Sequence, residues 1–172
     1  MKKPSGIVLA IVLFASGATS AAAQVRFGPH LSWGDNADFA IGGKLLFGLA
    51  DLAGEDTKNL EGSVALDWFP DCNGCSYFEA TAGVLYRFDI GETALPYAGG
   101  GLNWGRISYD TNVPGFGADS EIGLAAMGGI RFPLGNLTAY TDARITLGGA
   151  EQAVISFGLL LGGGGGSARI AR

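Results

Sequence analysis

Residues 77–88 read Tyr-Phe-Glu-Ala-Thr-Ala-Gly-Val-Leu-Tyr-Arg-Phe, and every second residue shares a character. The even positions, from Phe78 to Phe88, carry no charge, whereas the odd positions include Glu79 and Arg87. Successive side chains of a β-strand point to opposite faces of a sheet. This period of two therefore predicts a strand with one uncharged face.

Seven further segments follow the same period. They cover residues 25–33, 39–49, 60–68, 96–104, 122–132, 137–147 and 153–161. An even number of strands, each about ten residues long with one apolar face, is typical of outer-membrane barrels. We therefore predict an all-β fold, an eight-stranded antiparallel up-and-down transmembrane β-barrel over residues 24–162. Because Pro29 cannot donate a hydrogen bond to a neighbouring strand, we also expect a β-bulge near it.

Two features indicate that the uncharged faces point outward, toward lipid. Aromatic residues lie near both ends of these faces, where the interfacial girdles of membrane barrels are found. The opposite faces are rich in Gly, Ala, Ser and Tyr, which suit a narrow interior, whereas the outside of a soluble barrel would carry Lys and Glu along every strand. A soluble lipocalin-like barrel with an apolar interior is the alternative. The expected girdle consists of Phe27, Trp33, Phe39, Phe47, Trp68, Phe78, Phe88, Trp104 and Phe132.

The inward faces carry charged residues of balanced sign. Enclosed charges need partners, because a charge buried without one is strongly destabilising. We therefore expect a network of ion pairs in a lumen that side chains plug. Its expected members are Arg26, Lys44, Arg87, Arg131 and Arg144, together with Glu61, Asp67, Glu79, Glu121 and Asp142.

The first residues have the pattern of a secretory signal peptide. Lys2 and Lys3 precede an apolar run at residues 7–15 and three alanines at residues 21–23. The run is shorter than the roughly 20 residues that a transmembrane helix needs. We predict a signal peptide at residues 1–23, cleaved before Gln24, and a flexible Gly-rich tail at residues 163–172. The longest link, residues 108–120, would then face outside the cell and is a candidate contact for an extracellular ligand.

The segment Leu95-Pro96-Tyr97-Ala98-Gly99-Gly100-Gly101-Leu102-Asn103-Trp104-Gly105 is similar to the Pro-Tyr-x-Gly-x-Gly strand common in small outer-membrane barrels. With the leader and the eight segments, the chain resembles the OmpA-like and OmpX-like family of outer-membrane β-barrel domain proteins. The resemblance implies the outer membrane of a Gram-negative-type bacterium, contact with its lipid and insertion by its barrel-insertion machinery. Family members usually end on an aromatic residue that this machinery reads. Here Phe157 lies inside the last segment and the Gly-rich tail follows it.

Few residues offer catalytic, metal or cofactor chemistry. His30 and Ser32 are residue types that outer-membrane lipid A deacylases use, but both fall on the inward face, where a hydrogen-bonding role is expected. Cys72 and Cys75 lie between two strands, without the helix of a redox motif or the further ligands of a zinc site. We expect them to form a disulfide that braces an extracellular turn, since exported thiols meet an oxidising compartment. The net charge of -5 argues against nucleic acid as a partner.

The sequence therefore predicts a non-enzymatic outer-membrane barrel, without cofactor or metal, whose role is structural or depends on interactions of its loops. Three alternatives stay open. They are a narrow, porin-like pore for small solutes, a lipid-modifying outer-membrane enzyme, and the soluble lipocalin-like binding barrel.

Overall fold

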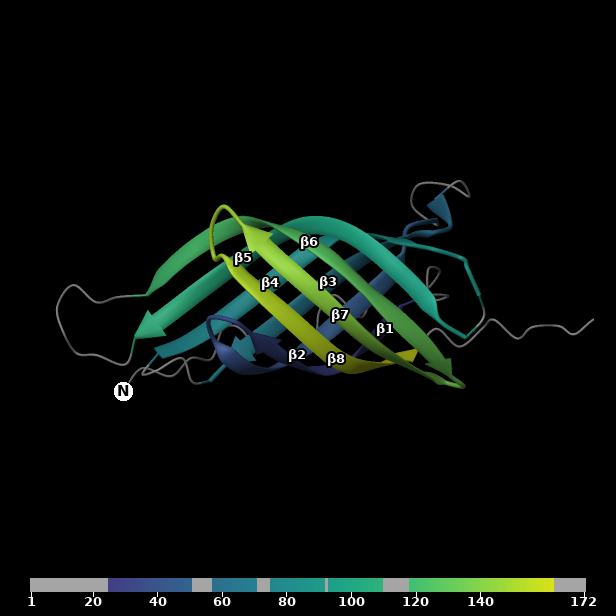
Figure 1. The fold of residues 1–172 in the computed structure, drawn as a ribbon, viewed down its shortest axis with the longest axis horizontal. Coiled ribbons are helices and arrows are strands. Elements are labelled where there is room, and N and C mark those ends of the chain that lie inside the picture. The colour runs from purple at the N-terminus through teal and green to yellow at the C-terminus, as the bar shows by residue number, and fades with distance from the viewer. Residues whose placement is uncertain (1–24, 51–56, 71–74, 92, 110–117, 163–172) are drawn as a thin grey trace, which may run out of the picture.

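The structure, a computed structural model, describes residues 25–50, 57–70, 75–91, 93–109 and 118–162. Eight antiparallel strands form a closed barrel, and Figure 1 shows them tilted across its long axis. The strands are β1 (Arg26–Gly34), β2 (Asp38–Gly48), β3 (Leu60–Phe69), β4 (Cys75–Arg87), β5 (Leu95–Tyr109), β6 (Asp119–Leu134), β7 (Leu137–Leu147) and β8 (Gln152–Gly162). No helix in the described part of the chain is long and apolar enough to cross a membrane.

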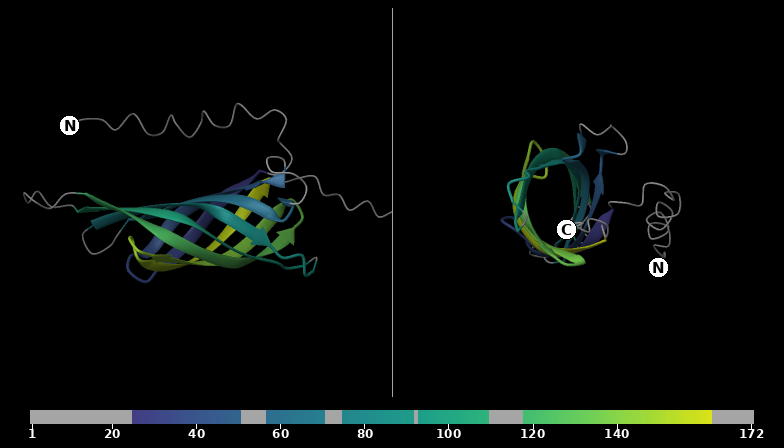
Figure 2. Two further views of the ribbon diagram at one scale, coloured as in Figure 1. Left: turned by 90° about the horizontal axis from the view of Figure 1, so that it is seen from above. Right: turned by 90° about the vertical axis from the view of Figure 1, so that its right-hand side faces the viewer.

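The barrel closes because the first strand pairs with the last. In that ladder Phe27 lies opposite Leu161 and Gly34 lies opposite Val154, while every other strand pairs with its neighbours in sequence. Viewed along its axis, the barrel is a continuous ring of strands (Figure 2). We call the end with the β1–β2 and β7–β8 turns the mouth end. The opposite end, where β1 begins and β8 ends, is the terminal end.

The predicted fold class is confirmed, and all eight predicted segments are strands. Six strands have bounds close to the prediction, whereas β5 and β6 are longer than expected. At the mouth end, β5 continues to Tyr109 and β6 already begins at Asp119. These ends still pair with neighbouring strands, although the apolar alternation has stopped there. Backbone N–H and C=O groups can pair whatever side chains they carry, and these ends therefore remain in the sheet.

The bulge expected near Pro29 is wrong. The pairing of β1 with β2 runs without a shift from Arg26 opposite Leu46 to Gly34 opposite Asp38. The pairing with β8 keeps one register on both sides of Pro29, with no partners across the ladder at Gly28 and Pro29. The backbone N–H that Pro29 lacks therefore leaves two positions of β1 without partners on β8, and no extra residue is inserted into the strand.

The barrel is apolar outside, and its interior holds buried charged and polar side chains together with two apolar clusters, one that includes Leu46 and Leu85 and one that includes Phe69. Leu124 and Phe157 are 67% and 61% exposed, whereas Glu79 and Arg131 on the inward faces are 0% and 1% exposed. A soluble barrel with an apolar interior would show the reverse distribution. The lipocalin-like alternative is therefore wrong for the described residues.

Aromatic side chains occupy both ends of the apolar exterior. At the mouth end Trp33 lies opposite Phe39, and Phe78 packs edge-on against Trp104 with ring centroids 6.1 Å apart. At the terminal end the structure adds Tyr86, whose ring contacts Phe88 at a centroid distance of 5.1 Å. The remaining residues expected in the girdle are placed by their strands, Trp68 near the mouth end and Phe27, Phe47 and Phe132 near the terminal end.

Candidate functional site

The lumen is occupied by charged side chains, and the first group lies near the terminal end. Glu61 is buried there, and its two carboxylate oxygens pair with Arg26 and Arg131. Arg87 also approaches Glu61, with Nη1 3.7 Å from Oε1, and its Nε lies 3.2 Å from the Asp89 carboxylate. One buried carboxylate thus holds three guanidinium groups.

The second group fills the middle of the barrel. Lys44 pairs with Asp142, whose carboxylate also accepts a hydrogen bond from the Tyr97 hydroxyl at 2.9 Å. The Lys44 ammonium lies 4.8 Å from the ring centroid of Tyr140, and the Arg131 guanidinium lies 4.3 Å from that of Tyr97. Both distances are within the range of cation–π attraction. The Tyr97 ring therefore joins the terminal group to the middle group.

The third group lies toward the mouth end and centres on Arg144. Its guanidinium bridges Glu79 and Asp67, with Nη1 3.1 Å from the Asp67 carboxylate. His30 Nε2 and the Ser32 hydroxyl both donate to Asp67 at 2.7 Å. These residues come from β1, β3, β4 and β7, and the contacts therefore cross the lumen as well as following the wall.

Further hydrogen bonds surround Glu79. Its carboxylate accepts from Asn103 Nδ2 at 3.0 Å and from the Tyr77 hydroxyl at 2.9 Å. Neither Asn103 nor Tyr77 was expected at the site, although both lie on the inward faces that the period of two defines. The expected network contained only charged residues. Polar, uncharged residues on the same inward faces were the signal that could have identified Asn103 and Tyr77.

This arrangement places paired side chains across the lumen. Buried ions need partners. The network gives Lys44, Arg131 and Arg144 at least one carboxylate each, while Arg131 Nη2 and Arg144 Nε have no hydrogen-bond partner. His30 and Ser32 belong to it and face away from the barrel exterior. They therefore cannot attack a lipid ester from the outer surface, as the lipid-modifying alternative would require.

Glu121 does not belong to this network in the described structure, although the sequence analysis grouped it with the other nine charges. Its side chain is exposed at the mouth end, where its carboxylate accepts a hydrogen bond from the Ala150 backbone N–H at 2.7 Å. The reason is the length of β6, which places Glu121 beyond the level of Arg144.

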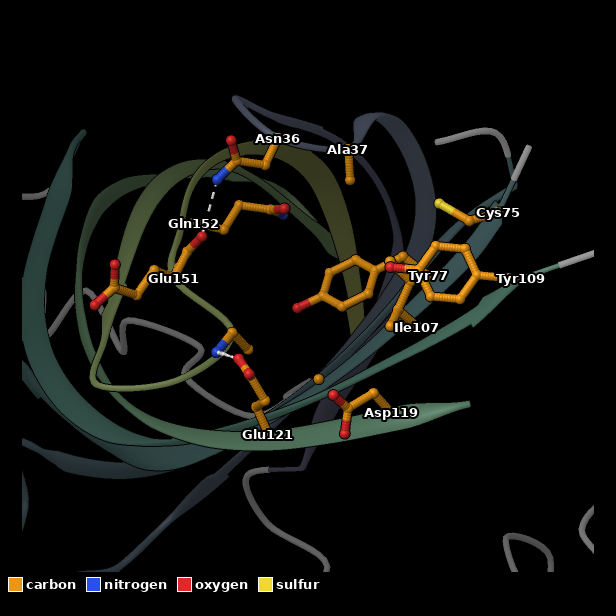
Figure 3. Close-up of a pocket in the computed structure, with 12 residues that line it drawn as sticks. Asn36, Ala37, Cys75, Tyr77, Ile107, Tyr109, Asp119, Glu121, Glu151 and Gln152 are labelled. Atoms are coloured by element: carbon orange, nitrogen blue, oxygen red, sulfur yellow. Dashed lines mark hydrogen bonds between the residues drawn. The ribbon is translucent and has the colours of Figure 1, made fainter. Parts of the chain in front are cut away.

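A pocket of about 490 Å³ lies above the network at the mouth end (Figure 3). Tyr77 links the two, because its ring lines the pocket while its hydroxyl donates to Glu79. The lining comes from β4, β5 and β6, from the first residue of β8, and from the β1–β2 and β7–β8 turns. Its residues are Asn36, Ala37, Cys75, Tyr77, Gly105, Ile107, Tyr109, Asp119, Glu121, Ala150, Glu151 and Gln152.

Two expectations concern cysteine and metal chemistry. Cys75 is buried at the start of β4, but Cys72 lies outside the described residues, and the Cys72–Cys75 disulfide stays a prediction. Within the described ranges, no group of three or more His, Cys, Asp or Glu side chains could hold a metal ion.

Several solved structures with a similar fold are outer-membrane proteins. The chain is similar to the N-terminal β-barrel domain of OprF from Pseudomonas aeruginosa, at 15% identity and a TM-score of 0.61, covering 83% of this chain and 98% of that one. It is also similar to Neisserial surface protein A, at 14% identity and a TM-score of 0.53 over 80% of this chain and 95% of that one. A major outer-membrane protein of Thermus thermophilus matches at 11% identity and a TM-score of 0.53, over 80% of this chain and 99% of that one.

No protein-family model matches the sequence, and no curated protein matches it. At these identities the likeness establishes the fold, the eight-stranded outer-membrane type of barrel, and leaves the role to be argued from the site.

Proposed function

We propose that this chain is a non-conducting outer-membrane scaffold of a Gram-negative-type bacterium, exported by a signal peptide at residues 1–23. It acts through its bulk in the membrane and through interactions at its mouth end, without catalysis. The apolar exterior with aromatic residues at both ends supports residence in a bilayer, since such a surface is matched to lipid and its interfaces. The fold that it shares with outer-membrane proteins supports the same location.

The observation that carries the proposal is the filled lumen. An eight-stranded barrel has an interior just wide enough for its own side chains. Here Arg131, Glu79 and Asp67 are each at most 1% exposed, and the ion pairs around them span the lumen. An ion would have to break several of these pairs to pass, and this disfavours the narrow-pore alternative.

Two experiments test this proposal. Membrane fractionation, followed by gels of boiled and unboiled protein, should place the chain in the outer membrane as a folded barrel that migrates differently before and after heating. Purified protein in planar bilayers should then show no stable channels, with a sixteen-stranded porin as the conducting control in the same bilayers. Steady, reproducible conductance would overturn the closed lumen and favour the pore. Recovery in the soluble fraction would overturn the membrane location.

A further inference from the structure

The group around Arg144 holds more negative than positive fixed charge. The carboxylates of Asp67 and Glu79 both pair with the single Arg144 guanidinium, and all three side chains are buried. The hydrogen bonds that Asn103 and Tyr77 donate to Glu79 bring no charge with them. One carboxylate charge of this group therefore lacks a cation, and a buried charge without a partner is strongly destabilising.

His30 is placed to supply the missing positive charge. Its side chain is buried, with Nε2 2.7 Å from the Asp67 carboxylate and Nδ1 2.8 Å from the Tyr140 hydroxyl. The ring is confined, because a Cβ at Gly42 or at Gly158 would collide with His30 atoms. In the neutral ring Nε2–H donates to Asp67 and Nδ1 accepts from Tyr140, whereas in the imidazolium both nitrogens donate. The ring can therefore gain a proton without moving.

The charged and titratable groups that face the imidazole ring come from three strands. Asp67 of β3 contacts the ring, and Arg144 of β7 lies on the other side of that carboxylate. Tyr140, also of β7, faces Nδ1. On β2 the inward cation is Lys44, which is paired with Asp142, and β8 carries no titratable residue. Asp67 is thus the carboxylate in contact with the ring among the described residues.

We propose that His30 is a proton-dependent member of the lumen network, charged in a mildly acidic medium and neutral in a mildly alkaline one. Imidazole is the side chain whose charge ordinarily changes between about pH 5 and 8. At low pH the folded barrel gains an ion pair that the unfolded chain lacks, so stability is highest in the acidic part of this range and falls as the pH rises. The filled lumen does not require this behaviour, and the inference therefore goes beyond the proposed function.

The first experiment observes the protonation of His30 directly. The chain has one histidine, so nitrogen-15 histidine labelling of the full mature chain, without an affinity tag, gives ring signals from His30 alone. The nitrogen-15 spectrum of the barrel folded in lipid nanodiscs should show two protonated ring nitrogens at about pH 6 and one at about pH 9. A ring that keeps one protonation state over this range would overturn the proposal.

Variants test whether the excess of carboxylates is the cause. Glu79→Gln keeps the size of the side chain and an oxygen acceptor, and it leaves Asp67 and Arg144 as a balanced pair. The pH midpoint of the His30 transition should move down by at least about one unit, a tenfold change in proton affinity. Glu121→Gln, the same change outside the network, is the matched control and should leave the midpoint unchanged. An unmoved midpoint in folded Glu79→Gln would overturn the charge-balance argument.

Stability gives a readout that does not depend on the Glu79 variant. In urea unfolding from lipid vesicles, the folded-to-unfolded ratio of the wild-type protein should fall at least about tenfold between about pH 6 and about pH 9. His30→Gln keeps a donor and an acceptor but has no charge to lose, and its ratio should change no more than about twofold. Exposed groups that titrate in the same range are common to both proteins and cancel in the comparison. The same pH dependence in both proteins would overturn the role of His30, and if His30→Gln does not fold, the wild-type spectrum decides.

Discussion

At the scale of single residues, the network makes some interior side chains far more important than exposed ones of the same type. Asp142 pairs with Lys44 and accepts from Tyr97 inside the barrel, whereas Asp89 pairs with Arg87 in an exposed turn. Both are aspartates beside a basic side chain. The two aspartates differ in their access to water. When an exposed aspartate is removed, water can solvate the basic side chain that is left, whereas a buried basic side chain stays without solvation.

Asp142→Ala should therefore destabilise the barrel by about 3 to 5 kcal/mol, because the Lys44 ammonium would stay buried without its partner. Asp89→Ala is the matched control and should cost less than about 1 kcal/mol, as exposed ion pairs do. Urea unfolding of the protein in lipid vesicles measures both. Similar losses for the two variants would contradict the view that the lumen is poorly hydrated.

A second prediction at this scale tests which face meets lipid. Val84 is 45% exposed on the barrel exterior, and Thr81 is buried inside, where its hydroxyl donates to Asn103 at 2.6 Å. Val84→Arg should cost roughly 2 to 4 kcal/mol of folding into bilayers, whereas Thr81→Ser keeps the hydroxyl and should cost little. The same vesicle assay measures both, and equal effects would show that the faces are assigned wrongly.

At the scale of the strand, glycines set how closely neighbouring parts of the barrel approach. On β2, a Cβ at Gly42 would collide with the His30 ring and the Leu66 carbonyl, whereas one at Gly43 would meet only the Gly28 carbonyl oxygen at 3.7 Å. These adjacent residues point to opposite faces. The interior is tightly filled at Gly42, and the exterior is open at Gly43.

Gly42→Ala should accordingly lower the free energy of unfolding by about 1 to 3 kcal/mol through overpacking. Gly43→Ala, one residue away on the same strand, should be close to neutral. The midpoint of urea unfolding distinguishes the two variants. A destabilised Gly43→Ala with an unaffected Gly42→Ala would mean that the strand is turned the other way.

The strands were predictable from the sequence because one face of each repeats at a period of two. The pairs in the lumen were not. Arg144 and Glu79 are 65 positions apart, and they meet because register and closure bring β7 and β4 together across the interior. The period of two along the sequence specifies neither the register of the strands nor the closure of the barrel. The same limit explains Glu121, whose inward direction was predictable while its height in the barrel was not.

At the scale of the whole molecule, stability is shared by eight ladders, and a local crosslink should matter little to insertion. Replacing Cys72 and Cys75 together with Ser should leave the gel shift of the folded barrel intact, because so short a closed loop contributes little entropic stabilisation. Thiol titration of the purified wild-type protein should find no free thiol. Reactive thiols would contradict the disulfide, and a double variant that fails to insert would contradict its peripheral role.

The pairing of β1 with β8 also fixes an order of events in time. Residues 26–34 are among the first of the barrel to leave the ribosome, and their partners at residues 152–162 are among the last. Until the final strand has been synthesised, β1 has one unsatisfied edge, and bringing it to β8 requires closure of a loop that spans nearly the whole barrel. The ring therefore cannot be completed while the chain is still growing, and the finished polypeptide must be kept from aggregating until both edges meet.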